Sequence, residues 1–105
     1  MDYGHKVDFH LAHHVDVSEA ISYLAQQLHC NSWYVACHHE HLFVFRLAQG
    51  SSDHYAVRVE CNAPVEKGVY HGSRARSFSI SPLHNEVNLT DKEVSELHAG
   101  LAGLK

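Results

Sequence analysis

The chain has 105 residues, 45% of them hydrophobic and 10% aromatic, which predicts one globular domain spanning residues 1–105 rather than a disordered chain. Eight Lys and Arg against twelve Asp and Glu give a net charge of −4 with neutral histidine, which argues against nucleic-acid binding. Three cysteines, an odd number, argue against a disulfide framework, and no hydrophobic run is long enough to cross a bilayer. We therefore expect a reduced, cytoplasmic protein without a signal peptide or membrane contact.

The N-terminal part of the chain predicts a strand followed by a helix. Residues 6–12 alternate hydrophobic and polar side chains, which is typical of a half-buried strand. Asp16 followed by Glu19 matches a capping box at the start of a helix. Hydrophobic residues then recur at helical spacing, namely Ile21, Leu24, Ala25 and Leu28. We expect this helix to end at residues 30–31, where Asn31 tolerates the left-handed conformation.

Three strands should follow, at Trp33–His38, His41–Ala48 and Tyr55–Cys61, with a tight turn at His39–Glu40 between the first two. The middle strand has hydrophobic residues at both odd and even positions. They are Phe43, Phe45 and Leu47 on one face, and Leu42 and Val44 on the other. A strand of this kind is covered on both faces of its sheet.

The segment before the last helix is less regular, with short strands expected at Val69–Tyr70 and Ser77–Ile80. Together these elements predict an α+β fold. It has an antiparallel sheet of four to five strands and two helices packed largely on one face. The expected order is strand, helix, strand, strand, strand, a further optional strand, and helix.

The C-terminal helix has the clearest start signal in the chain. Thr90 and Glu93 match a capping box, and Leu89 with Val94 matches a hydrophobic staple. Gly100 is expected to weaken the end of the helix. A hydrophobic stripe runs along the helix and consists of Val94, Leu97, Leu101 and Leu104. We expect this stripe to be a second candidate interaction surface.

The sheet face that the helices leave uncovered is the first candidate interaction surface. It should carry a hydrophobic centre, an aromatic side chain and a rim of charged residues, as protein interfaces do. The residues expected to bind a partner there are Tyr34, Leu42, Val44, Arg46 and Arg58. A Val44→Glu substitution should abolish association without unfolding the chain. The alternative is that segment 62–80 or the N-terminal strand folds over this face.

This face favours a small, non-catalytic intracellular protein that binds another protein. The classes of that size and kind include inhibitors, immunity proteins, anti-defence proteins and chaperone-type adaptors, and a homodimer through the same face is a variant. No convergent set of catalytic groups is evident, and Cys37 and His38, as neighbours on a strand, point to opposite faces. We expect neither catalysis nor a cofactor, but the abundance of histidine leaves open a third class, a small enzyme that uses histidine as an acid or base.

The twelve histidines leave a second interpretation open, a protein that binds or responds to a transition metal such as zinc, copper or nickel. The candidate ligands come from two histidine-rich clusters. One cluster supplies Cys37, His39 and His41, and the other supplies His10 and His14. No C-x-x-C pair and no H-E-x-x-H motif accompanies them. Zinc is accordingly the cofactor of the alternative interpretation only.

The order of one helix, three strands and a second helix resembles the double-stranded RNA-binding fold in topology. That resemblance implies a basic clamp at the start of the second helix. The corresponding stretch here is Thr90-Asp91-Lys92-Glu93, whose carboxylates would repel phosphate. We therefore expect a protein partner rather than a nucleic acid.

Overall fold

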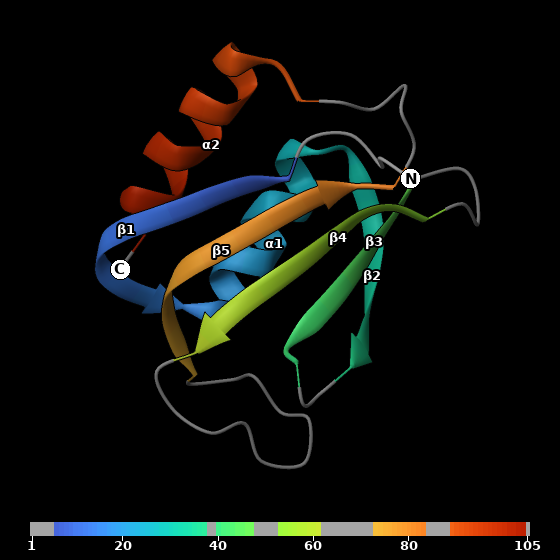
Figure 1. Cartoon of the computed structure of the whole chain (residues 1–105), viewed down its shortest axis with the longest axis horizontal. Coiled ribbons are helices and arrows are strands. Elements are labelled where there is room, and N and C mark those ends of the chain that lie inside the picture. Colours follow the sequence, from blue (N-terminus) through green and yellow to red (C-terminus); the bar gives the residue numbers. More distant parts are fainter. Residues whose placement is uncertain (1–5, 38–39, 48–52, 62–72, 84–88, 105) are drawn as a thin grey trace.

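The computed structural model of the chain describes residues 6–37, 40–47, 53–61, 73–83 and 89–104. Within these residues the elements follow one another in the order β1-α1-β2-β3-β4-β5-α2, which confirms the α+β class and the expected element order (Figure 1). Their bounds are β1 Val7–Asp16, α1 Val17–Gln27, β2 Cys30–Cys37, β3 Leu42–Leu47, β4 Asp53–Cys61, β5 Arg74–Pro82 and α2 Asp91–Ala102.

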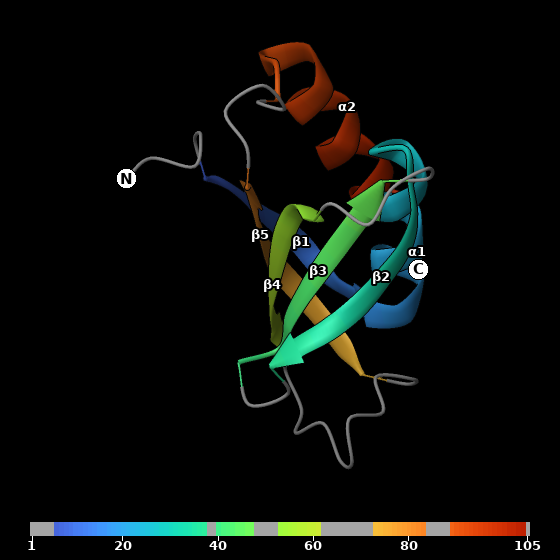
Figure 2. The ribbon, with the colours of Figure 1, turned by 90° about the vertical axis from the view of Figure 1, so that its right-hand side faces the viewer.

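The five strands form a single antiparallel sheet in the order β1-β5-β4-β3-β2. Strands β2 to β5 follow one another as a meander, whereas β1 pairs with β5 at the opposite end. Helix α1 connects β1 to β2 and therefore passes across one face of the sheet from edge to edge (Figures 1 and 2). The two edge strands of the described sheet are β1 and β2.

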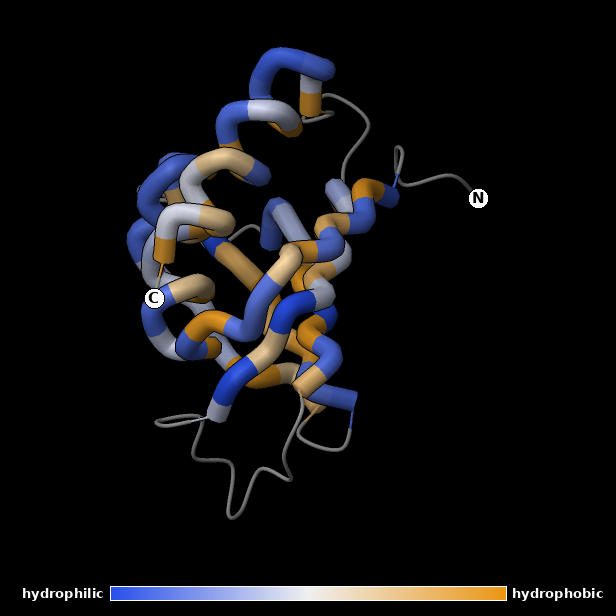
Figure 3. The backbone as a smooth tube through the Cα atoms, turned by 90° about the vertical axis from the view of Figure 1, so that its left-hand side faces the viewer, coloured by the Kyte–Doolittle hydropathy of each residue, from blue (hydrophilic) through white to orange (hydrophobic). Residues whose placement is uncertain are grey.

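The hydrophobic core lies between the sheet and the two helices, which are on the same side of it (Figure 2). Core residues form rows across neighbouring strands: Phe43, Val57 and Ile80 make one row, and Phe9 pairs with Phe78 in the next. None of these five side chains is more than 2% exposed. Figure 3 shows hydrophobic and hydrophilic residues alternating along the strands, so each strand has one face for the core.

Helix α1 starts where the sequence predicts and ends earlier. The carboxylate of Asp16 accepts a hydrogen bond from the Glu19 backbone N–H, 3.0 Å long, which caps the helix. The expected end at residues 30–31 is wrong, because His29 takes the left-handed conformation, with φ of 60°. Cys30 is already in β2 and only 5% exposed, so the chain must turn before it for that side chain to enter the core.

Helix α2 has the complete capping box that the sequence predicts. The Thr90 hydroxyl accepts from the Glu93 N–H at 3.2 Å, and the Glu93 carboxylate accepts from the Thr90 N–H at 3.0 Å. The prediction that the hydrophobic stripe is an interaction surface is wrong. Leu97 and Leu101 are 4% and 0% exposed because α2 packs on β1 and α1.

Gly100 has a packing role in this helix pair. A Cβ atom added at Gly100 would collide with the hydroxyl and ring of Tyr23, which projects from α1. The glycine therefore permits the close approach of α2 to α1, which the sequence interpretation took only as a weak point of the helix.

The strands are confirmed, with shifts at their ends. Strand β2 begins at Cys30, three residues before the expected start at Trp33. The predicted strand Ser77–Ile80 lies within the longer β5. The predicted strand Val69–Tyr70 and residue His39 of the predicted turn lie outside the described residues.

Candidate interaction face

The side of the sheet opposite the helices, here called the outer face, carries all five residues expected to bind a partner. Tyr34 on β2 lies opposite Val44 on β3, and Leu42 on β3 lies opposite Arg58 on β4. Arg46 lies two positions beyond Val44 on the same strand and therefore on the same face. The structure brings these residues together in the part of the sheet made by β2, β3 and β4.

No described helix or strand covers this face, since α1 and α2 lie on the other side (Figure 2). Strand β1 and residues 74–80 of β5 belong to the sheet itself. The sequence had left open that segment 62–80 or the N-terminal strand folds over this face. Of these segments, only residues 62–72 lie outside the described residues.

Val44 does not have the exposed position that the sequence predicts. It is 7% exposed, although it is separate from the main core cluster. Tyr34 flanks it across β2 and Ala56 flanks it across β4. Val44 is therefore the buried centre of the outer face, and Val44→Glu would bury a charge at considerable cost instead of leaving the fold intact.

Arg46, Tyr34 and Asp53 form a connected polar group on this face, here called the arginine cluster. The Arg46 Nε donates to one Asp53 oxygen at 3.0 Å, and the Tyr34 hydroxyl donates to the other at 3.2 Å. The Arg46 guanidinium also lies over the Tyr34 ring, 4.7 Å from its centroid. The hydrogen bond to Asp53 raises the pKa of Arg46 still further, so the guanidinium stays charged.

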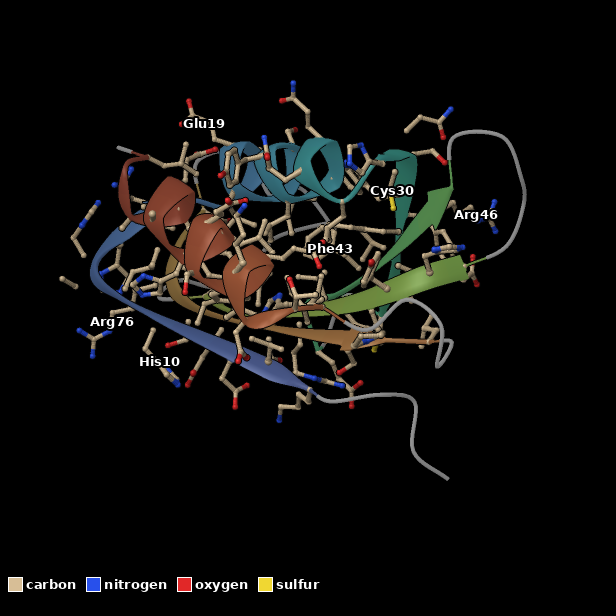
Figure 4. The ribbon with its side chains drawn as sticks, turned by 90° about the horizontal axis from the view of Figure 1, so that it is seen from above. His10, Glu19, Cys30, Phe43, Arg46 and Arg76 are labelled. Atoms are coloured by element: carbon tan, nitrogen blue, oxygen red, sulfur yellow. The ribbon has the colours of Figure 1, made fainter. Side chains whose placement is uncertain are left out.

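Asp53 was not among the residues that the sequence indicated for this face. It joins the cluster because β4 begins at Asp53, which lies opposite Arg46 across an irregularity in the pairing of β3 with β4. Figure 4 shows Arg46 at this end of the sheet, close to the start of β4. Two interactions on one planar group, the hydrogen bond to Asp53 and the contact with the Tyr34 ring, restrict the orientation of Arg46.

Arg58 is held more loosely. Its Nη1 lies 3.4 Å from a carboxylate oxygen of Glu40, and both side chains are about half exposed. An exposed ion pair of this kind contributes little to stability. Arg58 is therefore accessible at the border of the face.

A polar depression adjoins the hydrophobic centre of the outer face. Ser77 and Ser79 of β5 point outward between the longer side chains of β1 and β4, which leaves a hollow of ≈ 410 Å³. Its charged lining residues are Lys6, Asp8, Glu40, Arg58 and Glu60. Because both signs of charge are present, the depression has no strong net field that would select a phosphate or a metal ion.

The candidate metal ligands do not converge in the described part of the chain. Among the residues described, no group of three or more His, Cys, Asp and Glu side chains is placed to hold a metal ion. His10 lies on the outer face, as Figure 4 shows, and its Nδ1 is 3.2 Å from the Ser77 hydroxyl. His41 also lines the depression, whereas His14 and Cys37 do not, and His39 lies outside the described residues.

Two further histidines have a structural role that the sequence did not reveal. The His13 Nε2 donates to the Leu104 carbonyl at 3.0 Å, and the His98 Nε2 approaches the His10 carbonyl at 3.4 Å. The His98 ring also stacks on Phe9, with 6.3 Å between centroids. These contacts join α2 and its C-terminal end to β1, and only the tertiary structure brings them together.

Comparison with known proteins finds no family model that matches the chain, no similar curated protein and no similar solved structure. Among the described helices, none has the length and hydrophobicity that a membrane-spanning helix needs.

Proposed function

We propose that the chain is a small, non-catalytic protein that binds another protein through the outer face of β2, β3 and β4. The observation that supports this most directly is the arginine cluster, in which Arg46 is fixed by Tyr34 and Asp53 beside the buried Val44. Arginine and tyrosine are the residue types that dominate binding energy at protein interfaces. A fixed arginine loses little conformational freedom on binding, so more of its interaction energy becomes affinity.

The composition of the face also supports a protein partner. Its centre is hydrophobic and its border carries Arg58, Glu40 and Glu60, which matches the hydrophobic core and polar rim of protein interfaces. The proposal requires neither metal nor cofactor, and it is compatible with a reduced intracellular setting because all three cysteines are free. Inhibitors, immunity proteins, anti-defence proteins and chaperone-type adaptors are the protein classes that work in this way.

The test is affinity purification from cells that make the protein, followed by binding measurements with the partner recovered. Arg58→Glu reverses a charge at an exposed residue of the outer face and should weaken partner binding about tenfold or more. Lys92→Glu makes the same charge reversal at an exposed residue of α2 and serves as the matched control. Equal binding by both variants would place the partner elsewhere on the molecule and contradict the proposal.

A further inference from the structure

Strand β2 is an open edge of the sheet. It is the last strand in the order β1-β5-β4-β3-β2, and no described element pairs with its other side (Figure 2). Residues 31–34 and residue 36 are exposed, including the two large aromatic side chains Trp33 and Tyr34, at 39% and 38%. An edge strand presents a row of main-chain N–H and C=O groups that a further strand can pair with.

This edge lacks the residues that usually prevent such pairing. The sequence of β2, Cys30–Cys37, contains no charged residue and no proline. Protected edges carry charges, prolines, irregular pairing or a covering element. The other edge, β1, differs in charge, because Asp8 lies in it and Lys6 directly precedes it. Irregular pairing and a packed helix do not distinguish the two edges, since both strands have shifted pairing and both contact a helix.

Strand β2 is regular over its central part. Its pairing with β3 shifts between Cys30 and Ser32 and again between Val35 and Cys37. Between the shifts, Ser32–Val35 pairs without interruption, and this stretch includes both exposed aromatic residues. A partner strand therefore has a segment of uninterrupted register to pair with, centred on Trp33 and Tyr34.

We propose that β2 pairs antiparallel with β2 of a second copy of this chain. A two-fold symmetric contact places a surface against itself, so it requires a strand that does not repel its own copy. An uncharged strand meets this condition, and its aromatic residues come together at the centre of the contact. If the two-fold axis is perpendicular to the sheet, each residue of one β2 strand lies opposite a residue whose side chain points to the same face of the joined sheet. The axis must then pass beside a residue rather than between two residues, and the central residues of the strand are Trp33 and Tyr34.

The pairing has a consequence for the outer face. The two sheets join edge to edge with all helices on one side, so the two outer faces form one continuous surface. The arginine clusters of both copies then lie near its middle, since Tyr34 is on β2. The self-pairing stands on the edge strand alone and does not depend on the outer face binding another protein.

The first experiment is sedimentation of the full untagged chain at neutral pH and micromolar concentration. The wild-type chain is expected to sediment as a dimer, at twice the chain mass of 11.8 kDa. Ser32→Lys combined with Ala36→Lys adds two charges to exposed positions of β2 and is expected to give a monomer. Ser22→Lys combined with Ser95→Lys adds the same charge to exposed positions of α1 and α2, and this control is expected to remain a dimer.

A second measurement is needed because added lysines could unfold β2. Amide hydrogen exchange of the wild-type chain should show slower exchange in Ser32–Val35 at high than at low protein concentration, with no substitution present. A monomeric wild-type chain, or a dimer that survives the lysines in β2 with its fold intact, overturns the proposal. Arg58→Glu should remain a dimer, so loss of partner binding in that variant and loss of self-pairing are distinguishable.

Discussion

At the scale of single residues, backbone conformation decides the end of α1. His29 has a φ of 60°, in the left-handed region where a Cβ is unfavourable. Its side chain is exposed, and its N–H donates to the Gln26 carbonyl at 3.2 Å. The turn is therefore required by the route of the chain into β2, and histidine is tolerated there rather than preferred.

His29→Gly should stabilise the protein by about 0.5–1 kcal/mol, because glycine adopts this φ without strain while losing somewhat more entropy on folding. Urea unfolding at neutral pH measures the change in free energy. His29→Ala is the matched control, since it also removes the imidazole but keeps the Cβ. An equal gain from alanine would mean that the imidazole, not the backbone conformation, limits stability.

At the scale of elements, the start of each helix is fixed by a short-range hydrogen bond, and the placement of the helix by long-range packing. The capping box of Thr90 and Glu93 needs only four consecutive residues, so it was evident from the sequence. The place of α2 on β1 depends on residues far apart in the chain, such as His13 with Leu104. Local signals therefore located this helix but not the surface it buries.

Thr90→Ala should lower the free energy of unfolding by about 1 kcal/mol, since it removes the acceptor for the Glu93 N–H. Thr90→Ser keeps a hydroxyl at the same position and should lose much less. Thermal unfolding followed by circular dichroism compares the two variants. If alanine and serine give equal stability, the capping hydrogen bond contributes nothing measurable.

At the scale of the whole molecule, burial of ionisable side chains makes stability depend on pH. Burial raises the pKa of Cys30, of Cys61 and of Tyr55 above their ordinary values of 9.0 for cysteine and 10.0 for tyrosine. The unfolded chain therefore loses these protons first as the pH rises. Their contribution to stability is complete at neutral pH and is lost as the pH increases through the folded-state pKa values.

The free energy of unfolding should accordingly decrease as the pH rises above about 9. Urea unfolding under reducing conditions, at a series of pH values up to about 10.5, measures this loss. Cys30→Ala combined with Cys61→Ala should make the loss smaller. A free energy of unfolding that does not change over this range would contradict the expectation.

The outer face shows which features of the candidate site could be predicted from the sequence. Alternation in β3 and β4 was enough to place Leu42, Arg46 and Arg58 on one face, because side chains of a strand alternate regardless of its neighbours. Asp53 and the burial of Val44 were not predictable in this way. Both depend on which strand lies next to which, and at which register.

The sequence by itself determined the class of the fold, the order of its elements and the N-terminal caps of both helices. These features depend on periodicity and on residues only a few positions apart. Only the tertiary structure decided that β1 pairs with β5, that β2 is an open edge and that the stripe of α2 is buried. The physical reason is that strand neighbours and buried surfaces are chosen by the packing of the whole chain, and a hydrophobic side chain has the same sequence pattern whether it enters the core or binds a partner.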